Sequence, residues 1–311
     1  MNLLIIIYLL GIFFTCLYPF AVRQIPLSAF DQTLARLGIF SIFSAIILIF
    51  YRYNTWSSIF KYPIWIIAIV NAISTITSYI SYQKINIGTS VTTYFIYPIF
   101  LLLFGVIFNK IKINIRQWFV ILLSFAGVVI CHWNDLFIEK VELNRNYWIG
   151  LISIIISSIT SAIVIYYYHS RKLFKHTTEY LYNVYTIPFI LFLFIFAYQY
   201  LFSNRSTSES ASTNNTTEDQ NTVLYKINNY LSNISNFNKT IFFNIFIGFV
   251  GYFLMYYSFP KLPLFLVSLF SYSGIWMTIL LDKFLLNIPL SLWKIIGSGL
   301  VILSNVLYEI N

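Results

Sequence analysis

Long runs of apolar residues, separated mostly by short polar segments, occupy nearly the whole chain. A helix needs roughly 20 mainly apolar residues to cross the hydrocarbon core of a bilayer. Closed β-barrels instead show alternating segments of about 10 residues, so the continuous runs predict helices. We place ten transmembrane helices at 2–22, 33–51, 62–82, 88–108, 116–133, 147–169, 179–202, 240–259, 263–286 and 291–309. The pattern therefore predicts an all-α membrane protein.

Composition supports the same fold class. Hydrophobic residues make up 59% of the 311 residues and charged residues only 9%, whereas a soluble domain carries about 25% charged residues. The net charge of +9 could suggest a nucleic-acid partner, but the basic residues lie singly or in pairs at the ends of apolar runs. That distribution is typical of membrane flanks, so we expect the lipid bilayer as a partner and no nucleic acid.

One long polar segment, 203–238, interrupts the apolar pattern. It is rich in Ser, Thr and Asn and has no periodicity, which predicts a disordered loop. All Asn-x-Ser/Thr sequons of the chain fall in it, at Asn204, Asn214, Asn215, Asn233 and Asn238. Two interpretations stay open: sequons that arise by chance in an Asn-rich stretch, and a glycosylated loop on the luminal or extracellular side.

The basic residues also indicate an orientation. With ten helices and the N-terminus in the cytoplasm, most loop Lys and Arg residues, including the Arg171–Lys172 pair, fall on the cytoplasmic side, as the positive-inside rule requires. The same orientation puts the sequon segment outside. We therefore expect both termini in the cytoplasm of an integral, multi-pass protein, in a membrane that the sequence does not name.

An internal repeat divides the chain into halves. A shift of 177 residues lays helices 3–5 over helices 8–10 and aligns Tyr79 with Tyr256 and Lys84 with Lys261. Each half has five helices, an odd number, so the second half is inverted in the membrane. We predict ten transmembrane helices as two inverted five-helix repeats, 1–133 and 147–311, joined by a linker at 134–146. Inverted repeats are typical of secondary transporters, whose substrate site lies between them.

The stretch YQKINIGTSVTTYFIYPIFLLLFGVIFNKIKINIRQWFVILLSFAGVVI, from Tyr82 to Ile130, resembles the end of an EamA repeat of the drug/metabolite transporter superfamily. The likeness lies in Tyr94 to Pro98 and in Gly127 with the aliphatic residues after it. Arg36 also occupies a place where that family often has an arginine. Two features depart from the family. The Glu that is common in the turn between the fourth and fifth helices of each repeat is absent, and Ile275 stands where the second copy would have a proline. The resemblance implies a multi-pass transporter.

Charged residues inside apolar runs are costly and are therefore functional candidates. Arg36 lies in helix 2, where it could snorkel to the interface or act as a gate or anion contact. Asp282 and Lys283 are near the end of helix 9, where a solvated pair and a coupling-ion carboxylate at Asp282 are the competing interpretations. Arg36 and Asp282 are thus candidates for gating or ion coupling.

Polar uncharged side chains form stripes on several of the predicted helices. For helix 6, whose stripe includes Ser157 and Ser161, we expect close packing of small residues between helices. For helices 3, 4, 8 and 9 we expect a cavity lining that binds neutral or weakly cationic solutes through hydrogen bonds and cation–π contacts. The candidate substrate-binding residues are Asn71, Thr75, Tyr79, Thr93, Tyr94, Tyr97, Tyr252, Tyr256, Tyr272 and Trp276.

The sequence lacks the motifs of common membrane enzymes and pumps. It has no G-x-S-x-G, H-E-x-x-H or Walker loop, and its two cysteines and three histidines have no metal-ligand spacing. We therefore expect no cofactor, no metal and no catalytic residue, and a secondary transporter that moves a small-molecule solute by alternating access. A multi-pass enzyme acting on lipids and a non-transporting receptor or scaffold are the alternatives, and a homodimer is left open.

Overall fold

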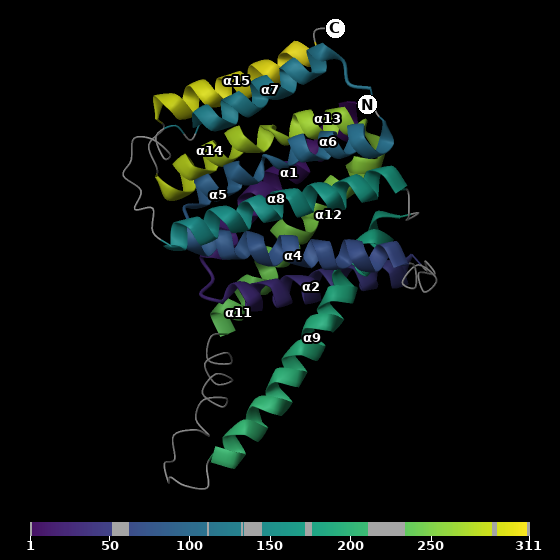
Figure 1. Ribbon diagram of the computed structural model, residues 1–311, viewed down its shortest axis with the longest axis vertical. Helices are drawn as coiled ribbons and strands as arrows, with labels where there is room; N and C mark the ends of the chain where they lie inside the picture. The colour runs from purple at the N-terminus through teal and green to yellow at the C-terminus, as the bar shows by residue number, and fades with distance from the viewer. Residues whose placement is uncertain are drawn as a thin grey trace.

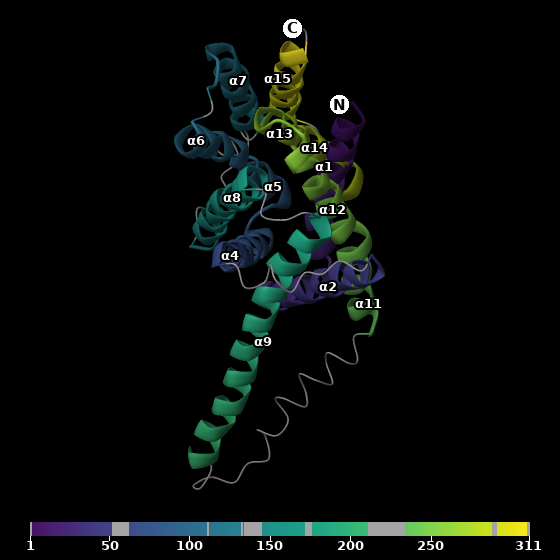
Figure 2. The ribbon, with the colours of Figure 1, turned by 90° about the vertical axis from the view of Figure 1, so that its right-hand side faces the viewer.

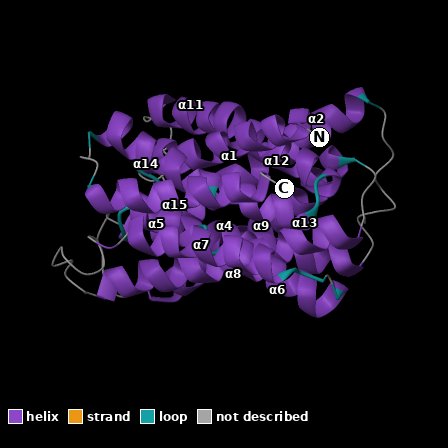
Figure 3. Ribbon diagram, turned by 90° about the horizontal axis from the view of Figure 1, so that it is seen from above, coloured by secondary structure: helices purple, strands orange, loops and turns teal. Residues whose placement is uncertain are grey.

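The described part of the chain consists of helices joined by short loops and contains no strand (Figure 3). The computed structural model describes residues 2–51, 62–110, 112–131, 133, 145–171, 176–210, 234–287 and 291–309. Most of the predicted linker, 134–144, lies outside these ranges, as do the sequons at Asn214, Asn215 and Asn233.

Within the described residues, every predicted apolar run lies mostly in helix, as Figure 1 shows along the chain. The elements are α1 (Asn2–Arg23), α2 (Ala29–Phe50), α4 (Tyr62–Lys84), α5 (Ile87–Tyr94), α6 (Tyr97–Asn109), α7 (Ile115–Cys131), α8 (Arg145–Arg171), α9 (Thr177–Ser210), α11 (Ile234–Phe242), the π-helix η2 (Phe243–Phe249), α12 (Val250–Ser258), the 3₁₀ turn η3 (Phe259–Lys261), α13 (Leu264–Ser271), α14 (Ser273–Leu286) and α15 (Leu292–Glu309).

Within the described residues, eight helical segments are long and apolar enough to cross a membrane. Two further apolar helices, Ile115–Cys131 and Leu292–Ser304, are shorter. Large apolar side chains point outward along the helices, with Phe50 80% and Phe284 73% exposed. Soluble proteins rarely expose so much apolar surface. The prediction of an all-α, multi-pass membrane protein is therefore confirmed.

Helix α2 begins four residues earlier than predicted, because Ser28 caps its N-terminus. The Ser28 side chain accepts a hydrogen bond from the Asp31 backbone N–H at 3.2 Å, which satisfies one of the unpaired donors at a helix start. The start at Ala29 places Arg36 two turns into the helix.

Two helices that were predicted as continuous are broken near their middle. The first break separates α5 from α6 at Phe95 and Ile96, and the second separates α13 from α14 at Tyr272. Pro98 explains the first, since it has no N–H for the Tyr94 carbonyl; the Ser158 hydroxyl donates to that carbonyl instead, at 3.1 Å. In the second, Tyr272 N–H bonds to the Leu269 carbonyl in a tighter, 3₁₀-like turn.

The helix boundaries recur at the 177-residue offset seen in the sequence. The starts of α5 and α7, Ile87 and Ile115, correspond to the starts of α13 and α15, Leu264 and Leu292. Helices α6 and α14 both end at a left-handed residue, Lys110 and Asn287, which are again 177 positions apart (φ 52° and 53°). Helix boundaries therefore recur at this offset even where residue identity does not.

The most extensive contacts between helices join the two halves of the chain. Helix α1 packs against α12, and α8 against α4; α2 packs against α9, and α7 against α15. The α7–α15 pair lies at one end of the bundle, as Figures 1 and 2 show. Each contact thus joins a helix of 1–133 to one of 147–311.

Both ends of the segment 203–238, which was predicted as a disordered loop, are helical. Helix α9 continues to Ser210, because extending an existing helix costs far less than nucleating one, and α11 begins at Ile234. The far end of α9 projects beyond the bundle (Figures 1 and 2). Asn204 therefore lies in α9 and Asn238 in α11.

Candidate functional site

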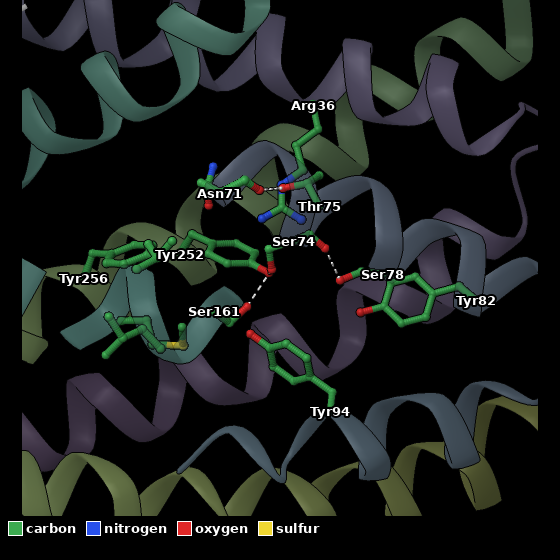
Figure 4. Close-up of a pocket in the computed structure, with 13 residues that line it drawn as sticks. Arg36, Asn71, Ser74, Thr75, Ser78, Tyr82, Tyr94, Ser161, Tyr252 and Tyr256 are labelled. Carbon is green, nitrogen blue, oxygen red and sulfur yellow. Dashed lines mark hydrogen bonds between the residues drawn. The ribbon is translucent and has the colours of Figure 1, made fainter. Parts of the chain in front are cut away.

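A small cavity lies between the two halves of the chain. Helices α2, α4 and α5 contribute one wall, and α8 and α12 contribute the other (Figure 4). Its lining consists of Arg36, Asn71, Ser74, Thr75, Ser78, Tyr82, Tyr94, Ser161, Val164, Ile165, Tyr252, Met255 and Tyr256. Ten of the thirteen side chains are polar or aromatic, so the cavity is a polar site inside an apolar bundle.

Arg36 lines this cavity and does not reach the interface, so the snorkelling interpretation is wrong. Its side chain is only 5% exposed, because α2 packs against α9 and α4 on this face. Figure 4 shows the guanidinium pointing toward the other lining residues. The hydroxyl of Tyr185 accepts a hydrogen bond from its Nη2 at 3.2 Å.

Aromatic rings surround the Arg36 guanidinium. Its central carbon lies 4.2 Å from the ring centre of Tyr252, and 5.2, 5.4 and 5.8 Å from those of Phe40, Tyr18 and Tyr185. A cation over an aromatic face gains about 0.5–2 kcal/mol. These rings therefore offset part of the cost of burying the charge.

In the described part of the chain, Arg36 forms no ion pair with a carboxylate; the ion pair found there joins Lys294 to Asp282. Buried charges are normally paired. The cavity thus holds a single buried positive charge that the described side chains do not neutralise.

Hydroxyl groups link α4 to α8 along one side of the cavity. The Oγ atoms of Ser74 and Ser161 are 2.6 Å apart, as are those of Ser78 and Ser157. The predicted close packing of small residues on helix 6 is therefore confirmed. Ser161 also lines the cavity, a role that the sequence interpretation missed.

Five of the candidate substrate-binding residues line the cavity: Asn71, Thr75, Tyr94, Tyr252 and Tyr256. The rings of Tyr252 and Tyr256 stack with centres 6.2 Å apart. On α8, Ser161, Val164 and Ile165 complete the lining. Their i, i+3, i+4 spacing was a usable signal, but two of the three are apolar and look like ordinary core residues.

The other five candidates lie outside the cavity lining. Tyr97 donates to the Ser271 hydroxyl at 2.6 Å, and Thr93 donates to the Thr89 carbonyl at 2.7 Å. Tyr272 is fully buried, and Trp276 packs against the main core. Tyr79 is occupied by a hydroxyl contact with Tyr18. Their hydroxyl and ring groups serve helix packing in this conformation.

Asp282 is buried, so the interpretation as a solvated pair with Lys283 is wrong. Asp282 is 3% exposed, and its Oδ2 lies 3.9 Å from the Lys294 Nζ on α15. It also lies against the first turn of α5, where a Cβ added to Gly88 would be 2.5 Å from Oδ2. The positive end of the α5 helix dipole stabilises a carboxylate at this position.

Tyr18 joins three elements beside the cavity through its hydroxyl. It lies 2.5 Å from the Tyr79 hydroxyl on α4 and donates to Asn244 Oδ1 at 2.5 Å, within the π-helix η2. Its ring also contacts Arg36. Tyr18 therefore holds the η2 segment and α4 against α1.

Tyr18→Phe is expected to lower the free energy of unfolding by roughly 1–3 kcal/mol, because it leaves buried Asn244 without its donor. Thermal melting of the purified protein measures the effect. Tyr257→Phe is the matched control, since Tyr257 is 37% exposed. Equal melting temperatures for the two variants would contradict the role assigned to Tyr18.

Comparison with known proteins gives a fold but no family. No family model and no curated protein sequence matches the chain. Among the solved structures, 27 chains match. One, described only as "Crystal structure of protein", aligns with a TM-score of 0.69 and 11% identity over 99% of this chain and 97% of its own. At that identity the likeness shows a shared fold alone: this chain has the all-helical architecture of that structure over essentially its full length.

Proposed function

We propose that this protein is a secondary transporter that moves a small organic solute across a membrane, and that it is not an enzyme. The observation that carries the proposal is the buried polar cavity between the halves, with Arg36 and Asn71 from one half facing Tyr252 and Ser161 from the other. A site at the junction of two repeats is where alternating-access carriers hold their substrate.

The halves are best understood as two inverted five-helix repeats, which makes ten membrane helices in total. Helix starts, helix breaks and left-handed ends that recur at 177 residues support the repeat. The pairing of α1 with α12 and of α8 with α4 supports two equivalent units that rock against each other. We place both termini in the cytoplasm on the charge distribution of the loops. The EamA resemblance agrees with this arrangement.

The two helix breaks, one of which lies at the cavity, provide points of bending. Tyr94 lines the cavity at the end of α5, and Tyr272 marks the equivalent break between α13 and α14. Interrupted helices are common near transporter sites because backbone groups freed there can rearrange. Alternating access would then involve motion at these breaks.

Counterflow in proteoliposomes tests the proposal. Purified protein is screened against a solute library by thermal shift, and each stabilising solute is preloaded into vesicles to measure exchange with labelled solute outside. We expect saturable counterflow, reduced at least about tenfold by Tyr94→Ala. Trp133→Ala, at a half-exposed position outside the cavity, serves as the control. Lipid turnover without counterflow would instead support a membrane enzyme.

A further inference from the structure

Two buried N–H groups line the cavity without a hydrogen-bond partner in the described residues. One is Arg36 Nε, and the other is the Asn71 side-chain nitrogen. Both side chains are 5% exposed. Leaving a buried donor unpaired costs free energy, more so for a charged group, so the absence of a protein partner for either group is informative.

The aromatic rings do not replace such a partner. The central carbon of the Arg36 guanidinium lies over the Tyr252 ring, 4.2 Å from its centre. An aromatic ring attracts the charge, but it does not provide the oxygen acceptor that an N–H group of arginine normally finds. The Arg36 Nε–H therefore still lacks an acceptor among the described residues.

Charge sets the class of that acceptor. Arg36 is the only charged side chain among the lining residues, and in the described part of the chain it has no carboxylate partner. An anion in the cavity would neutralise it, whereas a cation would add a second buried positive charge. A single cation balances a single negative charge, which favours a monoanion over a polyphosphate.

We propose that the cavity binds small organic monoanions, with an oxyanion such as a carboxylate accepting hydrogen bonds from Arg36 Nε and the Asn71 amide. The apolar body of the ligand would lie against Tyr94 and Tyr252, which line the cavity, once the cavity widens beyond its volume of about 20 Å³ in this conformation. This proposal names the cargo class of the transporter proposed above and rests on that function for its biological meaning. It replaces the sequence-based expectation of neutral or weakly cationic solutes.

Three probes of one size and different charge test it: benzoate, benzamide and benzylammonium. Full-length protein in detergent is titrated with each, and melting temperature and calorimetric heat are recorded, since a ligand that binds the folded state raises its stability. We expect saturable binding of benzoate and none of benzylammonium. Equal or tighter binding of benzamide or benzylammonium, or no stabilisation by benzoate, would overturn the proposal.

Variants assign the effect to the site. Arg36→Gln and Asn71→Leu are each expected to weaken benzoate binding, Arg36→Gln by at least about tenfold because it removes the charge-assisted bond. Arg36→Lys should recover only part, since it keeps the charge but not the planar donor fork. Arg23→Gln, at an exposed arginine outside the cavity, removes the same charge and should leave binding unchanged.

The outcome separates the two proposals. Benzoate binding that Arg36→Gln abolishes, without counterflow of any solute, would keep the anion site and reject the transport function. Counterflow of neutral or cationic solutes that Arg36→Gln leaves intact would keep the carrier and reject the anion site. Benzoate binding that is equal in Arg36→Gln and wild type would also reject the site as assigned.

Discussion

Gly297→Ala is expected to lower the free energy of unfolding by roughly 1–3 kcal/mol, the usual cost of overpacking. An added Cβ would overlap the Gly127 carbonyl oxygen and lie 2.6 Å from the Cys131 backbone nitrogen. Both atoms belong to the backbone of α7, so they cannot move aside as a flexible side chain could. Helices α7 and α15 would have to separate, although alanine itself is a better helix former than glycine.

The same helix supplies the control. Gly299 has no heavy atom within 4 Å of an added Cβ, so Gly299→Ala should gain only the helix-propensity term and leave stability equal or slightly higher. Thermal melting or detergent unfolding of the two variants gives the comparison. If both substitutions change stability alike, the close approach of α7 and α15 does not contribute as described. Small residues that let backbones meet are a recurrent basis of helix association in membranes.

The sequence was sufficient to predict the helices because lipid demands long apolar runs, and each run gives its own signal. The 177-residue offset read from the sequence is also the spacing between the left-handed helix ends at Lys110 and Asn287. The sequence predicted neither helix break. Pro98 was a usable signal for the first break, whereas Ile275 stands at the equivalent position of the second. There the Phe95 ring packs where a Cβ of Gly274 would lie. That contact is long-range and leaves no local signal.

The candidate site was predicted in part for a related reason. Asn71, Thr75 and Tyr94 were identifiable because polar residues are rare in these helices and must face away from lipid. Hydropathy does not show which tyrosines face a cavity and which face another helix, so Tyr97 and Tyr256 looked equivalent. Only packing separates them: Tyr97 bonds to Ser271, while Tyr256 lines the cavity.

The inward position of the Arg36 side chain could not be predicted from the sequence. A long cationic side chain near a helix end can reach the interface or turn inward, and both are consistent with one sequence. The choice depends on α2 lying against α4 and α9 and on the rings from α1 and α12 that accept the charge. Those neighbours are far apart in sequence, so the position of this charge is a property of the fold.

Asp282→Asn is expected to lower the free energy of unfolding by roughly 1–3 kcal/mol. The substitution keeps the shape of the side chain but removes the charge that faces Lys294 Nζ at 3.9 Å, and Lys294 is only 12% exposed. It also removes the favourable interaction with the first turn of α5 at Gly88. Asp282 thereby ties α14 to α15 and α5, and its loss should loosen the contact between the two halves.

Lys283→Gln is the matched control for this carboxylate. Lys283 is the next residue and is exposed, so its charge is screened and contributes little to stability. Melting curves of the two variants should therefore differ, with Asp282→Asn lower and Lys283→Gln near wild type. The double variant Asp282→Asn with Lys294→Met should recover part of the loss, because it removes the lysine charge that the single substitution leaves unpaired. A double variant less stable than Asp282→Asn alone would show that Lys294 stabilises the protein through partners other than this carboxylate.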